Sequence, residues 1–265
     1  MSVSVTTLPI TAVTTPTSEE RFPVGTWMLP SAIRPQVHAF YRFTRAADDI
    51  ADDRFMLPEQ KLARLFKLDP RPLGRGAPYA RRLIAAYKCD AVRNRTANWQ
   101  DLVDYCTLSA VPVGRFLLEL HGITDERAIA ACDNLCIALQ VMYVLRDIRN
   151  DRLRLNRVYL PMDWLREAGL REDALDSPKT TPEIRHILNR ALDEIDQMLI
   201  QAEALPRLVK GLRLRIKTAV VLRLGKRLAR RLRYADPLAN PNIELTHEQR
   251  FYCAVHGVLL ALFRR

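Results

Sequence analysis

The stretch RAADDIADD, residues 45–53, places four aspartates within six consecutive positions. So many like charges repel one another on an ordinary helix. Helical residues four positions apart lie on the same face, so Asp48 stacks on Asp52, and Asp49 stacks on Asp53. The spacing therefore predicts two candidate carboxylate pairs and leaves open which of them faces the interior.

An arginine and an apolar stripe accompany these carboxylates. Arg45 lies one helical turn before Asp48. The stripe consists of Phe40, Phe43, Ala47 and Ile50. A carboxylate pair beside an apolar face suits a Mg²⁺ ion that also binds a diphosphate, because this ion takes one or two protein carboxylates and completes its octahedron with phosphate oxygens and water. The alternative is a solvated acidic face.

Residues 135–161, LCIALQVMYVLRDIRNDRLRLNRVYLP, contain a second pair of this kind, Asp147 and Asp151, again preceded by an arginine, Arg146. Gln140 lies on the same stripe as this pair. The segment is otherwise largely apolar, so we expect a long helix at the centre of a bundle, where charged residues are seldom buried without partners. Two aspartate pairs that face each other across a cavity can share a cluster of Mg²⁺ ions. Two unrelated ion-pair patches are the alternative.

Helical spacing dominates the rest of the 265 residues. Strand signals are sparse, and the 48% of hydrophobic residues suffice for a sizeable core. We expect helices over residues 31–53, 57–67, 78–89, 98–107, 112–121, 124–151, 181–204, 206–234 and 246–263. No Pro/Gly-rich linker divides the chain. The sequence therefore predicts one all-α domain over residues 21–265, preceded by a loose Ser/Thr-rich tail at residues 1–20.

The cysteines and the chain ends bear on where the protein works. The five cysteines form no CxxC pair and lie in apolar-rich stretches, which favours reduced core thiols in a cytoplasmic protein. The histidines are scattered, and no His/Cys cluster has the spacing of a zinc site. The first residues lack the features of signal and transit peptides. The longest apolar stretch near the end, residues 253–263, is too short to span a bilayer.

Basic residues outnumber acidic ones by 41 − 30 = 11, and many of them gather late in the chain. Residues 204–235 contain eleven Arg or Lys and no acidic residue. We do not expect a nucleic-acid partner, because no aromatic residues are interleaved with these cations and no nucleic-acid motif is present. We expect attraction to an anionic membrane, and hence peripheral association with its inner face, with a plain solvated face as the alternative.

Three blocks of this sequence resemble one known family. Residues 22–53, which begin FPVG and end IADD, look like the first block of the squalene and phytoene synthases, the head-to-head trans-prenyl synthases. Residues 105–122 look like their middle block, and residues 138–161 look like their second aspartate block. Within the family, FPVG and SAVPVGR are most similar to the hydroxysqualene synthase of bacterial hopanoid pathways. The resemblance implies an all-α class I isoprenoid synthase bundle with a central cavity.

The resemblance also implies roles for individual residues. The implied Mg²⁺ ligands are Asp48, Asp52, Asp147 and Asp151, with Asp49 and Asp53 as supporting charges. The residues implied near the diphosphate are Tyr41, Arg45 and Arg157, of which Tyr41 is grouped with the catalytic residues. The residues implied along the cavity and the prenyl chains are Tyr105, Ser109, Val113, Gln140 and Tyr143.

The activity implied by the resemblance is Mg²⁺-dependent conversion of presqualene diphosphate to hydroxysqualene with loss of diphosphate. NADPH is not expected, since the chain has no G-x-G-x-x-G signature, although the reductases of the family lack it too. Tyr143 stands where the family has Asn, and Asn156 stands where it usually has Gly. A complete squalene or phytoene synthase that condenses two prenyl diphosphates is one alternative. A catalytically silent scaffold with the same fold is another.

Overall fold

The computed structural model describes residues 29–240 and 243–263, and most of these are helical. The α-helices are α1 (Arg34–Ala51), α2 (Pro58–Lys67), α3 (Ala77–Val92), α4 (Trp99–Ser109), α5 (Val111–Leu120), α6 (Glu126–Leu155), α7 (Met162–Glu167), α8 (Pro182–Gln201), α9 (Leu205–Leu208), α10 (Leu212–Tyr234) and α11 (His247–Phe263). The 3₁₀ turns are η2 (Arg71–Gly76), η3 (Glu172–Asp176) and η4 (Ala202–Ala204). In these ranges no strand forms, and Arg95 and Val158 make an isolated bridge. The predicted all-α fold is confirmed, whereas the expected tail at residues 1–20 lies outside the described residues.

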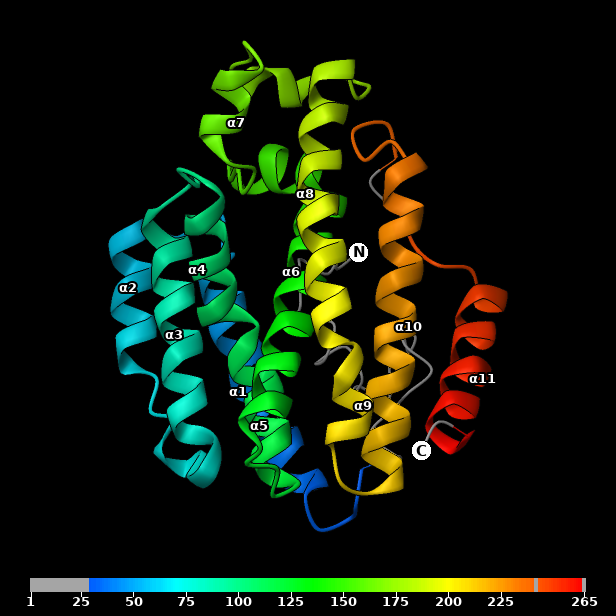
Figure 1. Ribbon diagram of the computed structural model, residues 1–265. Coiled ribbons are helices and arrows are strands. Elements are labelled where there is room, and N and C mark those ends of the chain that lie inside the picture. Colours follow the sequence, from blue (N-terminus) through cyan, green and yellow to red (C-terminus); the bar gives the residue numbers. More distant parts are fainter. Residues whose placement is uncertain (1–28, 241–242, 264–265) are drawn as a thin grey trace.

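Helix α6 runs through the middle of the bundle, with α2, α3 and α4 on one side and α10 and α11 on the other (Figure 1). Its apolar residues, including Leu139, Met142 and Leu145, are almost fully buried. The helix is long and apolar enough to cross a membrane, but 78% of its most apolar window is buried inside the protein. We therefore identify α6 as the interior helix that the sequence predicted.

Two helix starts follow from their sequence signals. The Asp125 carboxylate accepts the backbone N–H of Arg127 at 2.9 Å and caps α6. The Thr181 hydroxyl accepts the N–H of Ile184 at 3.3 Å and caps α8, in which Pro182 occupies the first turn. These caps fix where the helices on either side of α7 begin.

The prediction of a single helix over residues 206–234 is wrong. The chain leaves α9 at Leu208 and enters α10 only at Leu212. Between them Gly211 has φ = 87°, a backbone conformation that favours glycine. The apolar spacing continues through this break, so periodicity alone did not reveal it.

The cysteines are free thiols, as expected. Cys89 is half-buried, and the other four are buried in the apolar interior. Burial raises the pKa of the Cys106 thiol, which keeps this side chain protonated at neutral pH. These side chains act as small apolar residues of the core.

Candidate active site

The four aspartates at the end of α1 differ in how far their side chains are exposed to solvent. The side chains of Asp48 and Asp52 are each 12% exposed, whereas that of Asp49 is 64% exposed. Asp53 accepts the backbone N–H of Phe55 at 2.8 Å and shapes the turn that follows the helix. The Asp48–Asp52 pair is therefore the one that faces inward.

Two further residues implied by the resemblance share this face of α1. Arg45 Nη1 donates to Asp48 Oδ2 at 3.1 Å, and its Nη2 lies 3.4 Å from Asp49 Oδ1. Tyr41 lies one turn before Arg45 and is partly buried. Its backbone carbonyl accepts the Thr44 hydroxyl at 2.9 Å. One helix face thus presents a phenol, a guanidinium and a carboxylate in successive turns.

Arg157 connects the end of α1 to α3. Its Nη1 donates to Asp52 Oδ1 at 2.6 Å, and its Nη2 donates to the carbonyls of Ala51 at 2.9 Å and Asp90 at 3.1 Å. The residue is only 5% exposed. Its guanidinium therefore supplies a buried, permanent positive charge beside the first aspartate pair.

The second aspartate pair lies near the end of α6. Asp147 is 8% exposed and Asp151 is 4% exposed. Arg146 donates two hydrogen bonds to Asp147, from Nε to Oδ1 at 2.7 Å and from Nη2 to Oδ2 at 2.6 Å. The Arg146 guanidinium also lies 4.3 Å from the centroid of the Tyr143 ring. Tyr143 packs against Val220, Leu224, Leu245 and Cys253.

Tyr143, which stands where the family has Asn, therefore places an aromatic ring between α6 and α10. The ring supports Arg146, and Arg146 in turn holds Asp147. Tyr143 acts on the second pair through this arginine.

The two aspartate pairs act on each other electrostatically. Burial raises the pKa of Asp151, and the negative charges of Asp147 and Asp52 raise it further. Burial raises the pKa of Asp48 as well, together with the charges of Asp52 and Asp90. Helix α1 packs mainly on α3 and α2, and α6 packs mainly on α8 and α5. The pairs thus form one cluster of negative charge although their helices pack chiefly on other partners.

Asp90 belongs to this cluster and was not predicted. It lies on α3 and is 6% exposed. Its Oδ2 accepts the Tyr105 hydroxyl at 2.8 Å, and its Oδ1 accepts the Tyr159 hydroxyl at 2.9 Å. Burial raises the pKa of Asp90, while the Arg157 charge and the tyrosine hydrogen bonds oppose that rise. In the sequence it is a lone aspartate among apolar residues, which is too weak a signal to single out.

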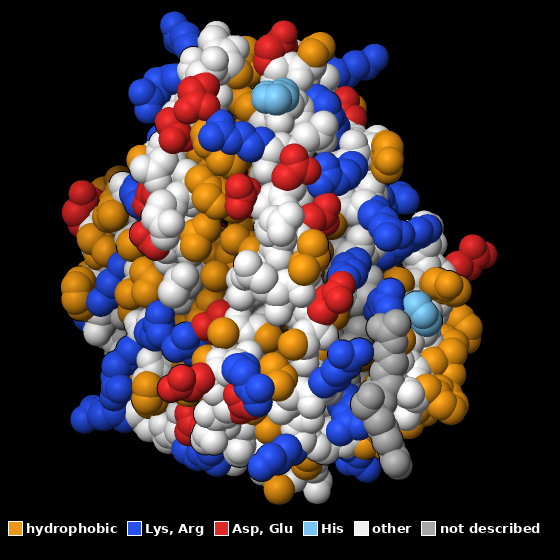
Figure 2. Space-filling view, in the orientation of Figure 1, with side chains coloured by type: hydrophobic (Ala, Val, Ile, Leu, Met, Phe, Trp, Pro, Cys, Tyr) orange, Lys and Arg blue, Asp and Glu red, His pale blue; other side chains and the backbone are white. Residues whose placement is uncertain are grey.

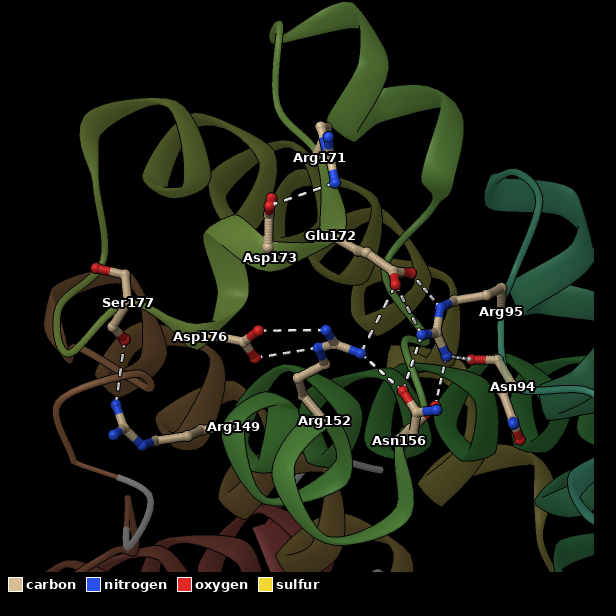
Figure 3. A network of polar contacts seen from close by, with 10 residues as sticks. All are labelled: Asn94, Arg95, Arg149, Arg152, Asn156, Arg171, Glu172, Asp173, Asp176 and Ser177. Carbon is tan, nitrogen blue, oxygen red and sulfur yellow. Dashed lines mark hydrogen bonds and ion pairs between the residues drawn. The ribbon is translucent and has the colours of Figure 1, made fainter.

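A polar network fixes the loop that carries Arg157. Asn156 has φ = 52°, the left-handed conformation that explains why glycine is usual here. Its side-chain oxygen accepts hydrogen bonds from Arg152 at 2.7 Å and from Arg95 at 2.9 Å (Figure 3). Glu172 on η3 accepts a further bond from Arg95 at 2.9 Å. The chain therefore turns sharply after α6 and directs Arg157 back towards α1.

The remaining predicted residues lie in the interior. Ser109 at the end of α4, Val113 on α5 and Gln140 on α6 are each at most 5% exposed. Ser109 Oγ and Gln140 Oε1 find no hydrogen-bond partner among the described residues. Buried oxygens of this kind are usually satisfied by a bound water or ligand.

The donor set suits Mg²⁺ that is bound together with a diphosphate. Within residues 29–240 and 243–263, no three Asp, Glu, His or Cys side chains form a compact metal site by themselves. An Mg²⁺ ion needs only one or two protein carboxylates when phosphate oxygens complete its shell. Burial raises the pKa of Asp48 and of Asp151, and neighbouring carboxylates raise both further, so a divalent cation would stabilise their charged forms. The residues therefore fit the expected ion.

Comparison with known proteins places this chain in a family. The model of the squalene/phytoene synthase family matches residues 15–71 and 75–249. This chain belongs to the squalene/phytoene synthase family. It is 35% identical over 259 residues to a hydroxysqualene synthase of Sinorhizobium fredii, across 91% of this chain and 87% of that protein. A hydroxysqualene synthase of Rhodopseudomonas palustris is 34% identical over 240 residues, across 83% and 82% of the two chains.

A solved structure agrees with the sequence relatives. The crystal structure of the squalene synthase HpnC from Alicyclobacillus acidocaldarius matches with a TM-score of 0.67 and 28% identity, over 79% of this chain and 86% of that one. The resemblance stated from the sequence blocks is thus confirmed, and the protein is an enzyme of the prenyltransferase type. The silent scaffold is not supported by these relatives. The roles of individual residues stay predictions.

Proposed function

We propose that this enzyme converts presqualene diphosphate to hydroxysqualene with loss of diphosphate, in an Mg²⁺-dependent reaction of squalene or hopanoid biosynthesis. The observation that carries the proposal is that Arg157 joins the two inward-facing aspartate pairs: its Nη1 donates to Asp52 Oδ1 at 2.6 Å, and its backbone N–H donates to the Asp151 carbonyl at 3.0 Å. The relatives named hydroxysqualene synthase, at 34–35% identity, favour this reaction over others in the family.

The charged residues would bind and neutralise the leaving group. Mg²⁺ held by Asp48, Asp52, Asp147 and Asp151 would supply positive charge to the departing diphosphate. Arg45 and Arg157 bring fixed positive charge to the same carboxylates, and guanidinium groups bind phosphate oxygens in a bidentate manner. This arrangement favours cleavage of the carbon–oxygen bond to diphosphate.

The buried polar residues would admit one water. Loss of diphosphate leaves a cyclopropylcarbinyl cation, which rearranges and takes up water, and release of one proton gives hydroxysqualene. The oxygens of Ser109 and Gln140 are suited to hold that water, because both are buried and have no partner among the described residues. The apolar interior around them keeps bulk solvent from the cation.

The test is to incubate the purified full-length chain with presqualene diphosphate and Mg²⁺ in ¹⁸O-labelled water and to analyse the products by mass spectrometry. We expect hydroxysqualene that carries one heavy oxygen, and no product when a chelator removes the metal. Farnesyl diphosphate alone should give no triterpene. Product from farnesyl diphosphate alone would instead identify a complete synthase, and squalene as the main product would contradict the proposed step.

A further inference from the structure

Helix α11 turns its large apolar side chains towards solvent. Those exposed are Phe251, Tyr252, Val255, Leu259, Leu262 and Phe263, and we call them the α11 ridge. Their spacing places them on one stripe of the helix. The inward residues are small ones, Cys253, Gly257 and Ala261. A helix on the surface of a soluble protein normally has its larger apolar residues on the inward face.

The packing of α11 on α10 fixes this orientation. A Cβ atom added to Gly257 would lie 2.7 Å from the Val220 side chain and 2.8 Å from its Cα. The two helix backbones thus approach so closely that only small residues fit between them. The ridge cannot rotate inward without forcing its large side chains into that contact.

A basic groove lies beside the ridge. It has a volume of about 430 Å³ and is bounded by α10, α11 and the corner formed by η4 and α9. Its cationic lining consists of Arg207, Arg215, Arg223 and Lys226. The acid in its wall, Glu203, is paired with Lys226, and Leu222 and Leu260 add apolar surface. Figure 2 shows apolar side chains over α11 at the lower right, and basic side chains over α10.

Only part of the basic stretch at residues 204–235 can face a membrane. Lys217 is 6% exposed, and Arg233 pairs with Asp193 and Asp196 at 2.7 Å each. The cations of this stretch that are exposed are Arg207, Lys210, Arg213, Arg227, Arg230 and Arg231. Three of these exposed cations, Arg207, Lys210 and Arg213, lie at the end of the bundle where α9 and the start of α10 lie (Figure 1).

We propose that the α11 ridge and the basic groove form a docking surface for an anionic lipid bilayer. The ridge enters the boundary between headgroups and acyl chains, and the groove takes lipid phosphates. The ridge runs from Phe251 to Phe263 and is therefore about 18 Å long, at 1.5 Å per residue. An anionic surface fits better than a second copy of this chain, because two chains of net charge +11 repel each other and an anionic bilayer attracts both.

The test is flotation of the full-length protein with vesicles of phosphatidylcholine, with and without phosphatidylglycerol. Phe251→Ser should lower the partition coefficient of the protein between vesicles and water about tenfold, since the variant lacks the apolar ring that the bilayer would bury. Arg207→Gln and Arg223→Gln should each lower it about fivefold on the anionic vesicles alone. The matched control is Phe66→Ser on α2, because Phe66 and Phe251 are both 71% exposed. It should bind like the parent chain.

Thermal melting in lipid-free buffer checks that all four variants remain folded. The proposal fails if the parent chain does not float with anionic vesicles, or if Phe251→Ser floats as well as the parent chain. A lipid-free dimer that Phe251→Ser converts to a monomer would also overturn it, since the ridge would then be an interface between copies.

Discussion

Replacement of Asp90 by alanine should destabilise the fold through two buried tyrosines. Both carboxylate oxygens of Asp90 accept hydrogen bonds, from Tyr105 at 2.8 Å and from Tyr159 at 2.9 Å. The residue is 6% exposed, so water cannot readily replace the lost acceptors. Asp90→Ala therefore leaves two phenol hydroxyls inside the protein without their partner.

The magnitude follows from these two contacts. A hydrogen bond to a charged group contributes about 1.5–3 kcal/mol, so the pair contributes about 3–6 kcal/mol. Burial of the carboxylate offsets part of this, as the raised pKa of Asp90 indicates. We expect a net loss of about 3 kcal/mol in the free energy of unfolding. Asp90→Asn should lose less, because the amide still accepts one of the two bonds.

Urea unfolding of single and double variants measures this loss. Tyr105→Phe should cost about 1.5–3 kcal/mol in the parent chain and less than about 1 kcal/mol in the Asp90→Ala background. The control is Asp104→Ala on α4, an exposed aspartate whose replacement should change stability by no more than about 0.5 kcal/mol. An Asp90→Ala chain within 1 kcal/mol of the parent, or fully additive effects in the double variant, would refute the reasoning.

Three further predictions concern the loop, a buried lysine and the aspartates. Asn156→Ala should cost about 1–2 kcal/mol in urea unfolding because its φ is 52°, whereas Asn156→Gly should cost less, and equal costs would contradict the backbone explanation. Burial lowers the pKa of Lys217 from 10.5 to about 8, so between these values the unfolded chain binds a proton that the folded protein lacks. Stability should therefore rise by about 3 kcal/mol from pH 8 to pH 10.5, relative to a Lys217→Met variant measured in parallel; parallel curves for the two proteins would argue against it. Asp48→Asn and Asp151→Asn should each lower the turnover of presqualene diphosphate by at least about a hundredfold, and Asp49→Asn by less than about threefold. Similar losses at all three positions would show that burial does not determine how much each carboxylate contributes to turnover.

Local spacing predicted the features that depend on neighbours in the chain. Residues four apart on a helix share a face, which predicted that Asp48 pairs with Asp52, although the spacing left open which pair faces inward. The helices expected from residues 124 and 181 begin next to Asp125 and Thr181, whose side chains the structure shows to cap backbone donors a few residues away. The apolar run before Asp147 likewise predicted the buried central helix.

Contacts between distant parts of the chain were beyond this reasoning. Asp90 is separated from Tyr159 by 69 positions, and Asp52 is separated from Arg157 by 105. The break at Gly211 was missed because leucines continue on both sides of it. The resemblance marked Tyr143 as a departure from the family pattern. Only packing revealed that its ring supports Arg146.

The most direct test of the metal and diphosphate site is the thermal stability of the full-length chain with a non-hydrolysable prenyl diphosphate analogue, measured with Mg²⁺ and with a chelator. If the two aspartate pairs hold Mg²⁺ and diphosphate together, the analogue at a hundred times its Kd should stabilise the fold by about 2.7 kcal/mol with Mg²⁺. With the chelator, or in Asp48→Asn and Asp151→Asn chains, we expect almost no stabilisation. Equal stabilisation with and without Mg²⁺, or full stabilisation of both variants, would contradict this account of the site.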